Sequence, residues 1–154
     1  MKVNNKSILV IGDVFLDIFG EYDAIKISPE APIPVIRKTE EKFFIGGAIA
    51  PGIEVAAQNL IKRAALLTET AFVVPKITVG KSTDSNLQSG IMLGAIDVID
   101  GMFQRILTEM GWENGNIIVT GGFGELISPH LLTKHTLLPT LTLDGIRIIY
   151  EKSS

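Results

Sequence analysis

Two short apolar runs near opposite ends of the chain constrain its fold more than any other feature. The first is Ile8–Ile11, closed by Gly12, and the second is Ile117–Thr120, closed by a pair of glycines. Continuous runs of this kind, rich in branched side chains, are typical of strands buried on both faces of a sheet. Helical patterns separate the two runs, and each connection between strands must cross a sheet face. The sequence therefore predicts a single α/β domain, with helices packed on a mixed sheet.

Two segments between these runs have helical spacing. Apolar residues recur at helical intervals over 53–67, which predicts an amphipathic helix. A longer and mostly buried helix is predicted from a cap at Thr83 or Ser85 to about Met110. Gly111 is its predicted stop, because glycine readily adopts the left-handed conformation that ends many helices.

Shorter segments complete the prediction. A strand is expected at 14–19, and two further strands, 35–38 and 42–45, are expected on either side of a charged turn. Another strand is expected at 71–74, where Pro75 stops it. The tail over 140–150 is predicted to be a last helix.

Composition excludes several classes of protein. A net charge of -3 provides no basic field for phosphate backbones, so nucleic acid is not an expected partner. Cysteine is absent, which excludes disulfides and thiolate chemistry and fits a cytoplasmic location. No export signal is predicted, and the charged residues inside the most apolar stretch, 91–107, argue against a membrane span. The 46% of hydrophobic residues exceeds what a small domain usually buries, which favours a homodimer.

Gly80-Lys81-Ser82-Thr83 imitates the end of a phosphate-binding loop. Pro75 stands where the complete pattern has its first glycine, so a full Walker loop is not predicted. Free amides at the start of the following helix can still attract an anion. A simple helix cap explains the same residues equally well.

Thr120-Gly121-Gly122-Phe123 follows the second apolar run. Glycines at the end of a buried strand let the backbone approach a flat ligand such as an adenine ring. Many strands end in two glycines only to turn, so this motif alone leaves both interpretations open.

Acidic and histidine side chains give no clear catalytic group. Asp13 follows the first strand, where a carboxylate can bind a substrate hydroxyl or magnesium or simply form a turn. Asp97 and Asp100 lie one helical turn apart, and a solvated stripe is favoured over a cation site. His130 and His135 lack zinc-type spacing. No catalytic residue and no metal ligand is assigned.

From Gly46 to Lys152 the motifs occur in a familiar order. They are Gly46-Gly47-Ala48-Ile49-Ala50-Pro51-Gly52, Gly80-Lys81-Ser82-Thr83, Gln88-Ser89-Gly90-Ile91, Asp100-Gly101, Thr120-Gly121-Gly122 and Leu141-Thr142-Leu143-Asp144-Gly145. This series resembles the nucleotide-binding C-terminal half of a type III pantothenate kinase. The resemblance implies one lobe of the actin-like, ribonuclease H-like ATPase fold, with ATP and magnesium as cofactors and a monovalent cation as a further candidate. It also implies a homodimer formed through the long helix, and nucleotide-binding residues Thr120, Gly121, Gly122, Phe123, Gly80 and Thr83.

The first 47 residues resemble a different family. Ile8-Leu9-Val10-Ile11-Gly12-Asp13-Val14-Phe15-Leu16-Asp17, the proline-rich stretch 27–35 and Gly46-Gly47-Ala48 are similar to the start of a ribokinase-type heptose-phosphate kinase. That resemblance implies substrate-binding roles for Asp13, Gly46 and Gly47. It divides the chain into a ribokinase-like segment, 1–47, and a pantothenate kinase-like lobe, 48–154, as in a chimera.

Three functions follow as hypotheses. The first is a kinase-derived domain that binds nucleotide and dimerises but lacks full catalysis, because the lobe that carries the family's catalytic aspartate has no counterpart in the sequence. The second is an active ATP-dependent kinase of pantothenate, in coenzyme A biosynthesis, or of a sugar phosphate. The third is a non-enzymatic chimeric scaffold.

Overall fold

The computed structural model describes residues 8–11, 15–19, 24–27, 34–36, 44–64, 66–112 and 115–153. These residues fall into two compact units. Unit one holds the described residues of 8–49, 115–122 and 135–153, and unit two holds those of 50–112 and 123–134. Each unit is described by itself.

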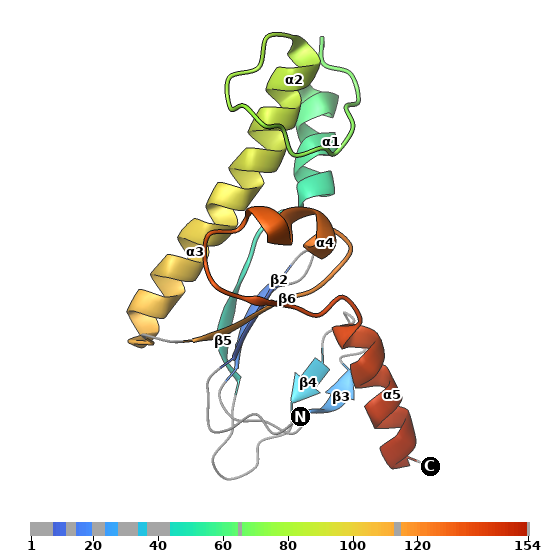
Figure 1. The fold of residues 1–154 in the computed structure, drawn as a ribbon. Helices are drawn as coiled ribbons and strands as arrows, with labels where there is room; N and C mark the ends of the chain where they lie inside the picture. The colour runs from blue at the N-terminus through green and yellow to red at the C-terminus, as the bar shows by residue number, and fades with distance from the viewer. Residues whose placement is uncertain are drawn as a thin grey trace. The chain divides into compact units, whose positions relative to one another are not determined.

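Unit one is built on a five-stranded sheet in the order β5-β2-β1-β6-β7 (Figure 1). The strands are β1 (Ile8–Ile11), β2 (Phe15–Phe19), β5 (Phe44–Ile49), β6 (Asn116–Val119) and β7 (Thr136–Leu137). β2 runs antiparallel to β1 and β5, whereas β6 runs parallel to β1 and β7. The sheet is therefore mixed, as the sequence predicts.

The two apolar runs of the sequence pair with each other at the centre of this sheet. Ile8 lies opposite Asn116, and Ile11 lies opposite Val119, in a parallel ladder. Ile117 and Val119 are buried, with Val119 fully inaccessible to solvent. β6 pairs with β1 along its whole length and with β7 at Ile118 and Val119, and apolar side chains are typical of such an interior strand.

A second, two-stranded sheet pairs β3 (Ala24–Ile27) with β4 (Pro34–Ile36). The strands on either side of the charged turn do not pair with each other, because β4 pairs with β3 and β5 pairs with β2. β5 also continues through Gly46 and Gly47 to Ile49, and its ladder with β2 includes both glycines. A turn signal in the sequence does not reveal which strand will pair with β5.

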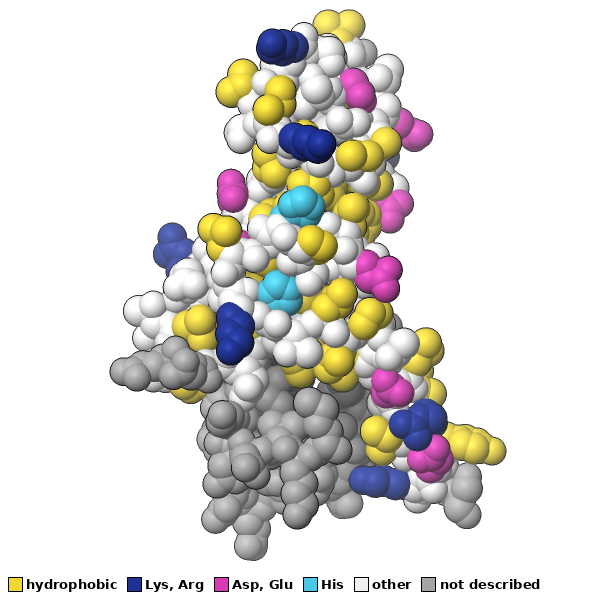
Figure 2. Space-filling model, viewed as in Figure 1, with side chains coloured by type: hydrophobic (Ala, Val, Ile, Leu, Met, Phe, Trp, Pro, Cys, Tyr) yellow, Lys and Arg dark blue, Asp and Glu magenta, His cyan; other side chains and the backbone are white. Residues whose placement is uncertain are grey.

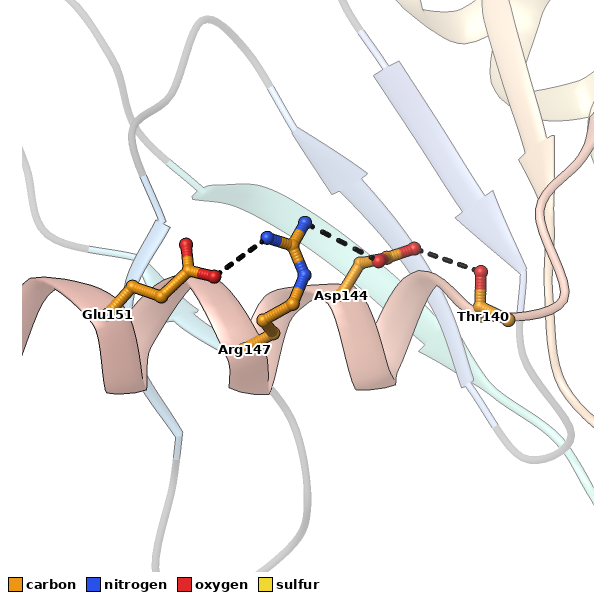
Figure 3. A network of polar contacts seen from close by, with 4 residues as sticks. All are labelled: Thr140, Asp144, Arg147 and Glu151. Atoms are coloured by element: carbon orange, nitrogen blue, oxygen red, sulfur yellow. Dashed lines mark hydrogen bonds and ion pairs between the residues drawn. The ribbon is translucent and has the colours of Figure 1, made fainter.

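The last helix of unit one, α5 (Leu141–Ser153), matches the predicted tail helix and extends beyond it. Figure 3 shows a polar network along its surface, in which Arg147 binds Glu151 at 3.0 Å and Asp144 at 3.7 Å. Thr140 donates a hydrogen bond to the same Asp144. The hydrogen bond with Glu151 and the charge of Glu151 are the main reasons that the pKa of Arg147 is raised. Exposed pairs at this spacing contribute little to stability and weaken in salt.

Unit two is helical. Its elements are α1 (Ile53–Arg63), α2 (Thr83–Gln88), a π-helical turn (Ser89–Leu93), α3 (Gly94–Met110), α4 (Gly124–Ile127) and a 3-10 turn (Ser128–His130). α2, the π-helical turn and α3 follow one another without a break and form the long helix predicted from the sequence (Figure 1). Gly111 ends it in the left-handed conformation, with φ of 64°, as predicted.

Both predicted caps of the long helix, Thr83 and Ser85, were wrong. Ser82 caps it, and its hydroxyl accepts from the Ser85 amide at 3.2 Å. Ser85 returns the contact, because its hydroxyl accepts from the Ser82 amide at 2.9 Å. This reciprocal capping box needs a hydroxyl three residues into the helix as well as at the cap, which selects Ser82 over Thr83.

The core of unit two is centred on Met92, Ile96 and Ile127. Phe72 and Val74 pack against this cluster, and residues 71–74 form no strand. The strand predicted there was therefore wrong. A short run of apolar residues fits a loop that places two of its side chains in a helical core as well as it fits a strand.

Many large apolar side chains remain exposed within the described residues. They are Ile49, Val55, Leu60, Leu66, Val73, Ile77, Val79, Val98, Leu132, Leu143, Ile146, Ile148 and Tyr150. On the face drawn in Figure 2 the apolar side chains are interspersed with charged ones. None of the described helices combines the length and the apolarity needed to cross a bilayer.

Candidate functional site

The turn after β6 contains three of the predicted nucleotide-binding residues. Thr120 follows the strand directly and is only 9% exposed, Gly121 has φ of 94°, and Gly122 is exposed. A positive φ of this size is rare for residues with a side chain, so the turn requires glycine at 121. The turn lies at the carboxyl end of a parallel strand, which is where open α/β sheets usually bind ligands.

The hydroxyl of Thr120 is the most unusual group in this turn. Its oxygen is buried and has no hydrogen-bond partner in the described part of the chain. A buried polar group without a partner costs about 1–3 kcal/mol, so such groups are rare and call for a specific explanation. A ligand atom that reaches the turn would supply the missing partner.

Phe123 follows Gly122 and belongs to unit two. Its ring meets Phe72 edge to face, with 5.2 Å between ring centroids and an interplanar angle of 86°. Such aromatic pairs contribute about 0.5–1.5 kcal/mol beyond the burial of their area. The structure therefore gives Phe123 a packing role, and a contact between this ring and a ligand stays a prediction.

Gly80 and Thr83, the other predicted nucleotide-binding residues, lie at the start of α2. The Ser85 hydroxyl accepts hydrogen bonds from the Lys81 amide, at 3.0 Å, and from the Ser82 amide. These two amides are therefore already paired and are not available to an anion. α2 spans only Thr83–Gln88 before the π-helical turn begins. These contacts favour the helix-cap interpretation of the motif, and a nucleotide contact here stays a prediction.

Gly80 itself is required by close packing. A β-carbon placed on it would lie 2.6 Å from the Asn86 nitrogen and 2.6 Å from the Ser85 carbonyl carbon. Both are backbone atoms of the first turn of α2, which cannot move without disturbing the cap. The glycine thus fits a tight turn whether or not a ligand binds there.

The predicted substrate-binding residues lie in or near the first strands. Gly46 and Gly47 are inside β5, opposite Ile18 and Asp17 of β2. Asp13 lies outside the described residues. The structure therefore assigns the two glycines a place in the sheet, and their role toward a substrate stays a prediction.

The environment of Asp100 differs from the one predicted. Instead of belonging only to a solvated stripe, it is half-buried, and its carboxylate accepts hydrogen bonds from the Leu132 amide at 2.8 Å and the Thr133 amide at 3.0 Å. Asp97 is exposed, as predicted. Sequence spacing could not reveal this difference, because the partners of Asp100 are backbone amides more than 30 residues further along the chain.

Among the described residues, no three His, Cys, Asp or Glu side chains are grouped so that they could hold a metal ion. Magnesium in nucleotide sites is often held by the phosphates and only one or two carboxylates. The observation therefore applies only to metal sites in which the protein supplies most of the ligands.

Comparison with known proteins identifies the relatives of this chain. A family model described as type III pantothenate kinase matches residues 35–105. A type III pantothenate kinase of Moorella thermoacetica is 40% identical over 116 residues, which are 75% of this chain and 45% of that protein. One of Roseiflexus castenholzii is 41% identical over 117 residues, which are 76% of this chain and 45% of that protein. The chain thus spans less than half the length of these relatives.

A solved structure shares the fold. It is described as a conserved Baf family transcriptional activator from Campylobacter jejuni, and it matches with a TM-score of 0.52 at 15% identity. The match covers 98% of this chain and 59% of the other. At 15% sequence identity, this likeness shows the fold alone. The sequence matches cover about three quarters of this chain, and over that part the chain is similar to type III pantothenate kinases.

Proposed function

We propose that this chain binds a nucleotide, ATP in the first place, at the turn Thr120-Gly121-Gly122. The observation that carries the proposal is the buried and unpartnered hydroxyl of Thr120 beside a glycine with positive φ. A hydroxyl can donate to a ring nitrogen or accept from an exocyclic amine, and two glycines leave room for a flat base. Relatives named type III pantothenate kinase favour ATP over other flat ligands.

Thr120→Val tests this site because it removes the hydroxyl and nearly conserves the volume. Without ligand, the variant should be as stable as the parent or more stable, by up to about 1–3 kcal/mol, because the unpartnered oxygen is gone. With ATP and magnesium, its affinity should fall by roughly 2- to 10-fold, as expected for one lost hydrogen bond. Calorimetric titration and thermal unfolding measure the two quantities.

Thr136→Val is the matched control, because Thr136 is an exposed threonine on the neighbouring strand β7. It should leave the affinity for ATP unchanged. Equal affinities for the parent, Thr120→Val and Thr136→Val would show that the hydroxyl takes no part in binding.

We further propose that the 154-residue chain alone has little or no kinase activity. Phosphoryl transfer depends on positioning and charge neutralisation around the whole phosphate, and this chain corresponds to 45% of a full-length relative. A coupled assay of ADP release, with pantothenate as acceptor, should give no turnover above the blank. Turnover with pantothenate, or with a heptose phosphate in a parallel assay, would favour the alternative of an active kinase.

Self-association belongs to the same proposal. Val98 on α3 is 60% exposed, and a β-carbon placed on Gly90 or Gly94 would meet nothing within 4 Å. An apolar and uncrowded helix surface of this kind suits close packing against a second copy. The division of the chain into a ribokinase-like segment, 1–47, and a lobe, 48–154, also remains a proposal, as do a chimeric origin and the monovalent cation.

A further inference from the structure

The carboxyl ends of β6 and β7 lie side by side within unit one. Val119 is paired with Leu137 in their parallel ladder. The Leu138 amide donates to the Val119 carbonyl at 2.8 Å, so the peptide group before Leu138 is bonded to the peptide group before Thr120. The proposed nucleotide turn therefore has Leu138 as its neighbour on the β7 side.

Thr120 and Leu138 share one face of the sheet. Side chains alternate between the two faces along a strand, and paired residues of neighbouring strands point to the same face. Val119 and Leu137 point to one face, so the residues that follow them, Thr120 and Leu138, point to the other. Neighbouring strands lie about 4.8 Å apart. An atom within hydrogen-bonding distance of the Thr120 hydroxyl is thus also close to the Leu138 side chain.

The backbone of Leu138 is held on both sides. Its amide is bonded to Val119, and its carbonyl accepts from the Leu141 amide at 3.3 Å, where α5 begins. The first turn of α5 is closed in the same way, because the Asp144 amide donates to the Thr140 carbonyl at 2.8 Å. The Leu138 side chain is half-buried, so part of it is open to a ligand. An apolar group that is fixed before binding loses little freedom when a ligand reaches it.

We propose that Leu138 contacts the base of the bound nucleotide, an inference that rests on the proposed function. Leucine has neither charge nor hydrogen-bond donor, and a phosphate buried against it would lack partners, which is costly. A flat, largely apolar ring gains from the same contact. Ligand sites combine apolar side chains with a few polar groups that fix orientation, and Leu138 beside the Thr120 hydroxyl is such a combination. Together the two side chains place the base, and not the phosphates, at the turn.

The test compares Leu138→Ala with Leu137→Ala, because both remove the same atoms from neighbouring, half-buried positions. Leu137 points to the other face of the sheet and is the matched control. The probe is an ATP analogue that carries its fluorophore on the γ-phosphate, with magnesium. Leu138→Ala should bind it roughly 4- to 15-fold more weakly than the parent, as expected when one or two methylene-sized contacts are lost. Leu137→Ala should bind it as the parent does, and Leu138→Met, which nearly conserves the apolar volume, should stay within about twofold.

Competition distinguishes the two ends of the nucleotide. Adenosine carries the base without phosphates, and inorganic triphosphate carries phosphates without the base. Leu138→Ala should weaken adenosine by the same factor as the analogue, and it should leave the affinity for triphosphate unchanged. A general disturbance of the turn would weaken both competitors. Equal losses for adenosine and triphosphate would therefore overturn the contact with the base.

The outcomes separate the inference from the function on which it rests. If the parent binds the analogue and Leu138→Ala binds it as tightly as Leu137→Ala does, the role of Leu138 is wrong and the nucleotide site stands. If the parent does not bind the analogue at all, the proposed site at Thr120 is wrong, and the inference about Leu138 falls with it.

Discussion

Replacing Phe103 with alanine should lower the free energy of unfolding by about 3–5 kcal/mol. Phe103 lies in the middle of α3 and is completely buried, at 0% exposure. Truncation removes most of a large apolar side chain and leaves a cavity that the surrounding helices fill only in part. Small domains have only about 5–15 kcal/mol of stability in total, so the loss is a large fraction of it. Urea unfolding followed by circular dichroism measures the change.

Val55→Ala is the matched control, because Val55 lies on α1 of the same unit and is 48% exposed. Its effect should stay within about 0.5 kcal/mol of the parent, since exposed positions tolerate truncation. If both variants unfolded at the same urea concentration, Phe103 would not occupy a tightly packed site. Equal slopes of the unfolding free energy against urea concentration would show that the variants differ in stability alone.

Gly80→Ala should destabilise the protein by about 1–3 kcal/mol, the usual range when a group is forced into occupied space. The added β-carbon would lie 2.6 Å from two backbone atoms, the Asn86 nitrogen and the Ser85 carbonyl carbon. Relief of that overlap requires the first turn of α2 to move, and the capping box between Ser82 and Ser85 moves with it. Thermal unfolding, with amide exchange at Ser85 and Asn86, measures the loss.

Gly101→Ala should have the opposite sign. Gly101 lies inside α3, and a β-carbon there meets nothing within 4 Å. Alanine in a helix interior is favoured over glycine by about 0.5–1 kcal/mol, so this variant should be more stable than the parent. A stabilising effect of Gly80→Ala would contradict the close packing at the start of α2. It would also reopen the interpretation of this motif as a loop with space for a ligand.

Features that depend on local chemistry could be predicted from the sequence. The long helix, its end at Gly111 and the buried strand before Thr120 are all as expected. Each is decided by residues within a few positions: helical spacing of apolar side chains, a glycine free to adopt positive φ, or a run of branched residues. The glycine turn was recognised for the same reason, because two glycines after a strand are visible in the sequence.

Features that depend on distant partners could not be predicted. Residues 71–74 have the composition of a strand, but Phe72 and Val74 pack on a helical core instead. The carboxylate of Asp100 has the spacing of a solvated stripe, but it binds amides of a segment far along the chain. The missing partner of the Thr120 hydroxyl is likewise a property of the surrounding fold. Sequence spacing reports which residues share a face, and it does not report what that face will meet.

The pairing of β1 with β6 sets an order of events during synthesis. Ile8 lies opposite Asn116, about 100 residues later in the chain, so β1 leaves the ribosome long before its parallel partner exists. At about 5–20 residues per second, the wait lasts roughly 5–20 seconds. Helices such as α3 depend on neighbours close in sequence and can form during that time. The apolar strand Ile8–Ile11 meanwhile stays without its central partner, which makes the nascent chain a candidate client for chaperones that bind short hydrophobic stretches.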